Sequence, residues 1–265
     1  MIDKVENVVT RYPIIFAHGI FMKKPLFRVF VHIRKKLAEL GYHAYIADTD
    51  GVGTIENNAE QLKKQIEEIL AREGAEKINI IAHSKGGLDS IYMIKELGME
   101  EKVASLTTIC TPHKGSQVAT WVTKLPSWLL RFLGFFVNIF YRLLKDERPD
   151  VVTACGQLKS KEEVASEGVC FEKVYCQSYS STMDKASSDF LLSVPFLISR
   201  HYEKDLSDGM VSNGSASQFG EYKGECLNES ISHNEVVCFM TGRKKKERVV
   251  AFYQTLCADL SARGY

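Results

Sequence analysis

Ser84 lies between an apolar run and residues at helical spacing, a position typical of a catalytic nucleophile. Ser84 follows the β-branched run of residues 78–82 and precedes apolar residues at helical spacing. A sharp turn between a strand and a helix exposes the serine hydroxyl and strains the backbone, so the residues two positions before and after must be small. Ala82 and Gly86 meet this requirement. We therefore interpret Ser84 as a catalytic nucleophile rather than as an ordinary helix N-cap serine.

An acid and a base follow Ser84 along the chain. Asp205 and Asp208 are two candidate acids, and His233 is the last histidine. The order nucleophile, acid, base is that of the α/β-hydrolases, in which the turn carrying the serine is called the nucleophile elbow. In such a triad the histidine takes the serine proton and the acid orients the imidazole. His113 comes too early in the chain to be the base.

The end of the first apolar run predicts one donor of an oxyanion hole. Residues 12–17 read as a buried strand, and Gly19 directly after it lets the backbone approach a substrate closely. We expect the amide of Ile20 to be the donor, with Phe21 as a second candidate. The amide of Lys85, the residue after the nucleophile, supplies the other donor. The alternative is an ordinary turn that ends the strand.

The elements that must position these groups alternate between strands and helices. Short apolar strands are expected at residues 12–17, 43–47, 78–82, 105–110 and 171–178. Apolar residues at helical spacing occupy residues 27–40, 62–70, 88–92 and 249–260. This alternation predicts an α/β fold with a mostly parallel sheet and helices on both faces. The length of 265 residues fits a single domain over residues 1–265.

Composition and charge limit the classes of partner and the cellular compartment that we expect. The net charge is +1, from 34 basic and 33 acidic residues, so nucleic acid is not an expected partner. The seven cysteines form no CxxC pair, which argues against a zinc site and a full disulfide framework. The N-terminus does not read as a signal peptide, which favours the cytoplasm, or secretion if the chain is a trimmed mature form. The oligomeric state stays open.

Several motifs in order resemble the bacterial true lipases, the pseudomonad group of triacylglycerol lipases. The matching stretches are Tyr12–Gly19, Ala82–Ser90, Lys102–Ala119, Asp208–Ser212 and the surroundings of His233. The resemblance implies an α/β-hydrolase fold with a helical lid insertion, which we place at residues 120–168. It also implies hydrolysis of carboxylic esters through an acyl-enzyme on Ser84, with Asp208 rather than Asp205 as the acid.

The most apolar segment, residues 121–144, has three interpretations. It is too interrupted by charged residues and a proline for a clean membrane span. It can be a buried core helix, a membrane-surface anchor, or the mobile lid that the resemblance implies. In the lid interpretation, transient contact with a lipid interface and contact with the substrate are expected. The residues that we expect to meet the substrate are Phe21, Phe132, Leu133, Phe135 and Phe136.

The resemblance also raises the question of a structural calcium ion near the catalytic histidine. Asp189 and Glu235 correspond to its carboxylate ligands, but Phe239 stands where a glutamine is expected, and an apolar ring cannot ligate calcium. We therefore predict no metal and no cofactor. The substrate is an ester of small-molecule or lipid type, most simply an acylglycerol. The alternatives are a short-to-medium-chain carboxylesterase without interfacial activation and a catalytically silent binding protein of this fold. Acyl-chain preference stays open.

Overall fold

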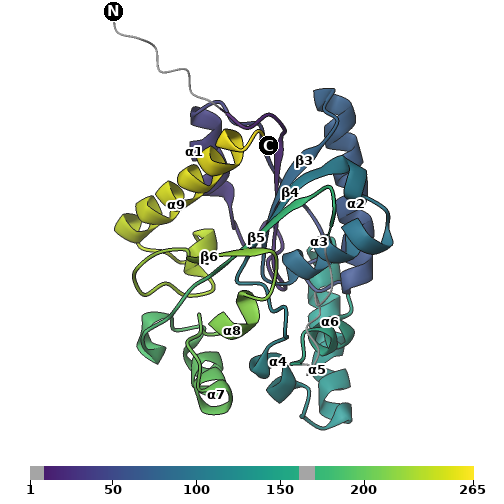
Figure 1. Cartoon of the computed structure of the whole chain (residues 1–265). Coiled ribbons are helices and arrows are strands. Elements are labelled where there is room, and N and C mark those ends of the chain that lie inside the picture. The colour runs from purple at the N-terminus through teal and green to yellow at the C-terminus, as the bar shows by residue number, and fades with distance from the viewer. Residues whose placement is uncertain (1–8, 161–170) are drawn as a thin grey trace, which may run out of the picture.

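A six-stranded parallel sheet forms the centre of the molecule (Figure 1). The computed structural model describes residues 9–160 and 171–265. The strand order is β2-β1-β3-β4-β5-β6, and every pairing is parallel. The strands are β1 (Ile14–Ala17), β2 (Ala44–Ile46), β3 (Ile78–His83), β4 (Val103–Ile109), β5 (Tyr175–Ser180) and β6 (Glu221–Glu225).

Helices cover both faces of this sheet. The helices α1 (Val31–Glu39) and α9 (Arg243–Ala262) pack on one face, and α2 (Ile55–Glu73) and α3 (Lys85–Glu96) pack on the other (Figure 1). Every residue of β1, β3 and β4 is buried, which explains why these strands are mostly apolar or small-residue runs and do not alternate with exposed polar residues. The expected fold class, α/β with helices on both faces, is confirmed.

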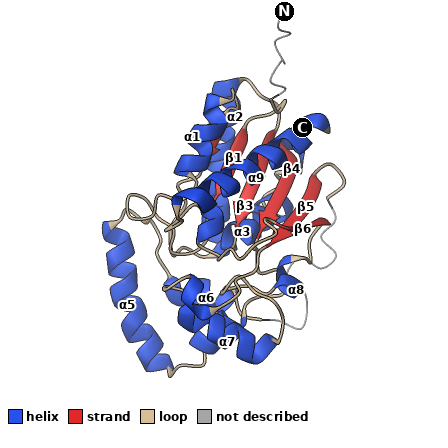
Figure 2. Cartoon of the chain, turned by 90° about the vertical axis from the view of Figure 1, so that its left-hand side faces the viewer, coloured by secondary structure: helices blue, strands red, loops and turns tan. Residues whose placement is uncertain are grey.

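A group of helices lies beyond the carboxyl ends of the strands (Figure 2). Between β4 and β5 the chain forms α4 (Gln117–Val122), α5 (Ser127–Leu143) and α6 (Val151–Gln157). Between β5 and β6 it forms α7 (Ser193–Glu203) and α8 (Asn213–Ala216). Short 3₁₀ turns occur at Glu100–Lys102, Ala186–Ser188 and Glu235–Val237. Of the insertion expected at residues 120–168, residues 161–168 lie outside the described part of the chain.

Helix α5 is not a core helix. Only Gly134 and Tyr141 of its residues are buried, and its other aromatic side chains are exposed. The helix lies at the edge of the molecule (Figure 2). The interpretation of residues 121–144 as buried core is therefore wrong. Among the described residues, no helix combines the length and apolar character that crossing a bilayer requires.

Candidate active site

Ser84 occupies the strained turn that its sequence predicts. It connects β3 to α3 with φ 55° and ψ −130°, and its amide donates to the Ile109 carbonyl at 2.9 Å. The need for glycine at position 86 is steric, because a Cβ on Gly86 would lie 2.6 Å from the carbonyl oxygen of His18 and 2.7 Å from that of Ala17. These are backbone atoms that cannot move aside. The local packing thus forces a sharp turn with Ser84 at its apex.

His233 and Asp208 form a buried pair. His233 Nδ1 lies 2.6 Å from Asp208 Oδ2, and the backbone amide of His233 donates to the Asp208 carbonyl at 2.9 Å. The other carboxylate oxygen accepts from the amides of Met210 at 2.9 Å and Val211 at 2.8 Å, which fixes the side chain. Asp205 instead accepts from the amides of Leu206 and Gly214. Of the two candidate acids, the structure brings Asp208 to the histidine.

The environment of His233 makes it a strong base. Burial alone lowers the pKa of His233, but the Asp208 carboxylate outweighs burial and raises that pKa to about 10. The neighbouring His83 ring packs on the His233 ring, with centroids 4.3 Å apart. Burial and the nearby His233 hold the pKa of His83 well below its usual value, so His83 is a neutral neighbour. Ser84, the candidate nucleophile, directly follows His83, whose ring contacts the candidate base His233.

The hydrogen bond between Ser84 and His233 that catalysis requires is not formed in this structure. Among the described residues, a hydrogen bond joins His233 to Asp208 but none joins His233 to the Ser84 hydroxyl. Catalytic hydrogen bonds are often long without substrate and tighten when the substrate binds.

The loop after β1 places one free amide beside Ser84. A Cβ on Gly19 would lie 2.8 Å from the Ser84 Cβ, so this loop runs directly against the nucleophile. The amide of Phe21 donates to the Gly51 carbonyl at 2.6 Å, which rules out Phe21 as the second candidate donor. Among the described residues, the amides of Ile20 and Lys85 have no hydrogen-bond acceptor. For Lys85 this follows from its position in the first turn of α3.

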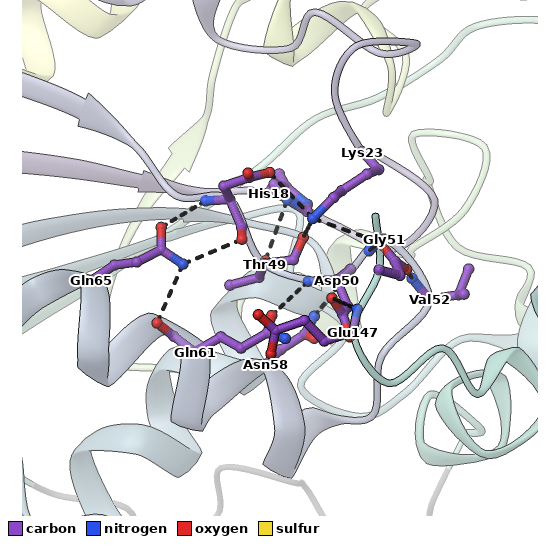
Figure 3. A network of polar contacts seen from close by, with 12 residues as sticks. His18, Lys23, Thr49, Asp50, Gly51, Val52, Asn58, Gln61, Gln65 and Glu147 are labelled. Atoms are coloured by element: carbon purple, nitrogen blue, oxygen red, sulfur yellow. Dashed lines mark hydrogen bonds and ion pairs between the residues drawn. The ribbon is translucent and has the colours of Figure 1, made fainter. Parts of the chain in front are cut away.

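A buried polar network holds this loop in place (Figure 3). Lys23, only 4% exposed, donates to the Thr49 carbonyl at 3.2 Å and lies 3.7 Å from Asp146. Asp146, just after α5, accepts from the amides of Gly51 at 2.9 Å and Val52 at 3.0 Å. The oxyanion loop, the loop after β2 and the end of α5 are thus tied together. Sequence reasoning did not reveal this network, because its partners lie far apart in the chain.

Two apolar pockets flank Phe21. The first, of about 300 Å³, contains His233 and is lined by the oxyanion loop and by residues that lead into α7, including Leu191 and Pro195. The second, of about 160 Å³, lies beneath α5 and is lined in part by Leu133. The residues preceding and beginning α7 therefore form one wall of the pocket at His233, a role that no sequence pattern in residues 180–200 indicated.

The residues expected to meet the substrate separate into two groups. Phe21 lines both pockets and Leu133 lines the pocket beneath α5. Phe132, Phe135 and Phe136 are 57%, 60% and 55% exposed and line neither of these two pockets. These three side chains face solvent, and their contact with an acyl chain stays a prediction.

His113 and Cys110 lie near the same edge of the sheet but have a structural character. His113 is fully buried, stacks on Phe219 with ring centroids 5.1 Å apart and has a pKa lowered to about 3 by burial. Cys110 lies beside the Asp208–His233 pair, and burial raises the pKa of its thiol well above the usual value. His113 is therefore a weak proton acceptor, the Cys110 thiol stays protonated, and neither side chain is exposed to a substrate.

The carboxylates of Asp189 and Glu235 do not fit a calcium site. Both oxygens of Glu235 lie 2.8 Å from the ammonium of Lys245, so this carboxylate already has a cation. Asp189 accepts from the Ser232 hydroxyl at 2.7 Å and from the side-chain amide of Asn234 at 3.1 Å. Calcium requires about six to eight oxygen ligands, and a lysine in the ligand shell opposes a divalent ion.

Comparison with known proteins agrees with this geometry. A family model described as the alpha/beta hydrolase fold matches residues 12–187. The triacylglycerol lipase of Pseudarthrobacter phenanthrenivorans is 35% identical over 162 residues, which cover 57% of this chain and 50% of that protein. The triacylglycerol lipase of Vibrio cholerae is 39% identical over 115 residues, or 43% of this chain and 36% of that protein. The chain thus spans half or less of the length of these relatives.

Solved structures show the same fold at low sequence identity. A metagenomic carboxyl esterase is similar with a TM-score of 0.68 and 16% identity, over 92% of this chain and 76% of that chain. A Bacillus licheniformis lipase in its mature form is similar with a TM-score of 0.57 and 18% identity, over 84% of each chain. Because the family model matches residues 12–187, more than half of the chain, this protein belongs to the α/β-hydrolase fold family.

Proposed function

We propose that this protein is a serine ester hydrolase, and specifically a lipase. The observation that carries the proposal is the placement of Ser84 in a strained turn beside the buried His233–Asp208 pair. Free amides and an apolar pocket adjoin these groups. The curated relatives described above are triacylglycerol lipases, which supports an acylglycerol-type substrate.

In the proposed mechanism, His233 Nε2 takes the proton of the Ser84 hydroxyl as its oxygen attacks the ester carbonyl. Asp208 holds the imidazole orientation and stabilises the imidazolium that forms. The amides of Ile20 and Lys85 bind the oxyanion of the tetrahedral intermediate, each donor contributing about 3 kcal/mol to the transition state. The imidazolium then protonates the leaving alcohol. Water attacks the acyl-enzyme by the same route and releases the acid.

The pocket beside His233 suits an uncharged chain. Apart from His233 and Asn234, its lining is apolar and includes Leu192 and Met210. Burying the methylenes of an acyl chain there contributes about 0.8 kcal/mol each. Helix α5 is the proposed lid, because its exposed aromatic residues offer a surface for a lipid interface. Its C-terminal end holds the oxyanion loop through Tyr141, so movement of α5 would reach the catalytic groups.

A series of p-nitrophenyl esters from acetate to palmitate tests this proposal. A lipase should favour the longer chains, and Phe136→Ser should lower activity on long chains more than on acetate or butyrate, with a modest fall in melting temperature. Equal loss on all chain lengths would favour a carboxylesterase without interfacial activation. Absence of hydrolysis of every ester would favour the silent binding protein, although such proteins usually lack a triad residue.

A further inference from the structure

A third hollow lies beside the pocket that contains His233 (the catalytic pocket). It measures about 490 Å³ and lies between the segment leading into α1, the first turns of α1 and the first turn of α9. Its described lining contains three cations and no carboxylate, and the remaining side chains are apolar apart from one imidazole and one thiol. The lining residues are Leu26, Arg28, Val31, His32, Lys35, Cys238, Phe239 and Lys246.

Within the part of the chain that the structure describes, the cations that line this hollow are not held in ion pairs, although Glu39 interacts electrostatically with Lys35. Among the described residues, none of Arg28, Lys35 and Lys246 forms a salt bridge. Their immediate neighbours on the same helices do form them, since Lys36 pairs with Glu39 at 2.7 Å and Lys245 pairs with Glu235 at 2.8 Å. Carboxylates are therefore available on this face, but they neutralise other cations. The hollow keeps a concentrated positive field, to which the N-terminal ends of α1 and α9 add.

Aromatic side chains lie between the hollow and the catalytic pocket. Phe239 lines both spaces, and His233 lines the catalytic pocket. The ring of Phe27 packs on Phe239 with centroids 5.2 Å apart and also lines the catalytic pocket. Leu26 and Met240, which are 52% and 67% exposed, add apolar surface nearby. Basic, aromatic and catalytic groups are thus continuous on this side of the molecule.

We propose that the hollow binds the phosphate of an anionic phospholipid head group while an acyl ester of that lipid lies at Ser84. This inference rests on the proposed ester hydrolase function and names the substrate class of the same site. Arginine and lysine are the side chains that bind phosphate oxygens best. A triacylglycerol carries no charge and would leave these cations unused, whereas a phospholipid presents an anion beside its acyl chains.

The proposed reaction is hydrolysis alone. The bond between the acyl carbon and the glycerol oxygen breaks, and water supplies the hydroxyl of the fatty acid and the proton of the released alcohol. The phosphate stays on the lysophospholipid. Inorganic phosphate shares the charge of the head group but not its apolar contacts, so the two ligands can be told apart.

A pair of matched double variants tests the inference. Arg28→Glu with Lys246→Glu reverses two cations of the hollow. Arg34→Glu with Lys244→Glu makes the same charge change on α1 and α9 at positions that do not line it. The measurement is the ratio of kcat/KM for soluble dihexanoylphosphatidylglycerol to that for uncharged dihexanoylglycerol. A basic residue near an anionic lipid contributes roughly fivefold to affinity. The ratio should therefore fall at least tenfold in the hollow variant and stay within twofold in the control.

A second experiment measures lipid binding without turnover. In a Ser84→Ala background, the protein should sediment with phosphatidylglycerol vesicles more than with phosphatidylcholine vesicles, and the hollow variant should lose this preference. Added inorganic phosphate, at ionic strength matched with sodium chloride, should raise KM for the anionic ester.

The outcomes separate the inference from the proposed function. An unchanged ratio in the hollow variant, or an equal fall in the control, overturns the inference while hydrolysis of the uncharged ester upholds the function. No hydrolysis of either ester by the wild type overturns the proposed function. The vesicle experiment then still tests whether the hollow binds an anionic lipid. Competition by inorganic phosphate without any preference for anionic vesicles overturns the assignment to a lipid.

Discussion

Removing the hydroxyl of Tyr141 should slow ester hydrolysis through the oxyanion loop. This hydroxyl donates to the carbonyl of Phe21 at 2.6 Å, and the amide of Phe21 donates to Gly51 at 2.6 Å. Phe21 adopts a left-handed conformation with φ 66°, which these two bonds hold. The ring of Tyr141 packs directly against Gly51, so Tyr141→Phe keeps the packing and removes only the donor.

The size of the effect follows from the lost hydrogen bond and from the neighbouring amide. The Phe21 carbonyl also accepts from the Lys23 amide at 3.1 Å, so removing the tyrosine donor costs about 0.5–1.5 kcal/mol of folding free energy. Loosening of the loop displaces the Ile20 amide, whose contribution to the transition state is about 3 kcal/mol. Loss of half of that contribution corresponds to a fall of about tenfold in kcat. KM should change little, because the oxyanion exists only after the attack.

The assay is steady-state hydrolysis of p-nitrophenyl butyrate, with thermal unfolding of each variant measured in parallel. Tyr253→Phe is the matched control, because the hydroxyl of Tyr253 is also buried and donates to a backbone carbonyl, that of Val236, at 3.1 Å. Both variants should lose similar stability, but only Tyr141→Phe should lose kcat. A wild-type kcat in Tyr141→Phe, or an equal loss in both variants, would refute the proposed clamp on the oxyanion loop.

Three further predictions concern the acid, the base and metal. Because Asp208 raises the pKa of His233, the neutral base appears only at alkaline pH, so kcat/KM should rise with pH through a pKa above 6.5 and fall as pH drops. Asp208→Asn should shift this limb to lower pH, and an unshifted limb would contradict the pairing. In the same assay, Asp208→Asn should lower kcat by orders of magnitude and Asp205→Asn should have a small effect; the reverse order would identify Asp205 as the acid. EDTA should change neither activity nor melting temperature, since Lys245 neutralises Glu235, and a loss that calcium restores would show a metal site.

The parts of the site that depend on local sequence were predictable. The elbow at Ser84 requires an apolar strand, small flanking residues and a following helix, all within a few positions. The end of α2 was also predictable, because Gly74 closes it in a left-handed conformation with φ 62°. Helix α1 was expected to start at Phe27 but starts at Val31, because Phe30 has φ 60° and interrupts the helical backbone.

The parts that depend on distant contacts were not predictable. Strand β6 has an exposed and mostly charged sequence, so it carries no apolar pattern, and its pairing with β5 defines it as a strand. The place of Leu191 and Pro195 in the wall of the pocket at His233 depends on where the chain between β5 and β6 folds. The bonds from Asp146 to Gly51 and Val52 span 95 and 94 positions, beyond the range of any local pattern.

The central claim is that Ser84 is a nucleophile activated by His233. The most direct test is to measure hydrolysis of p-nitrophenyl butyrate by the wild type, Ser84→Ala and His233→Ala, with circular dichroism to show that each is folded. The wild type should hydrolyse the ester, and each folded variant should retain less than about one per cent of its kcat, because removing either group of a triad costs several orders of magnitude. A folded Ser84→Ala protein that keeps more than a few per cent of wild-type activity would contradict the account.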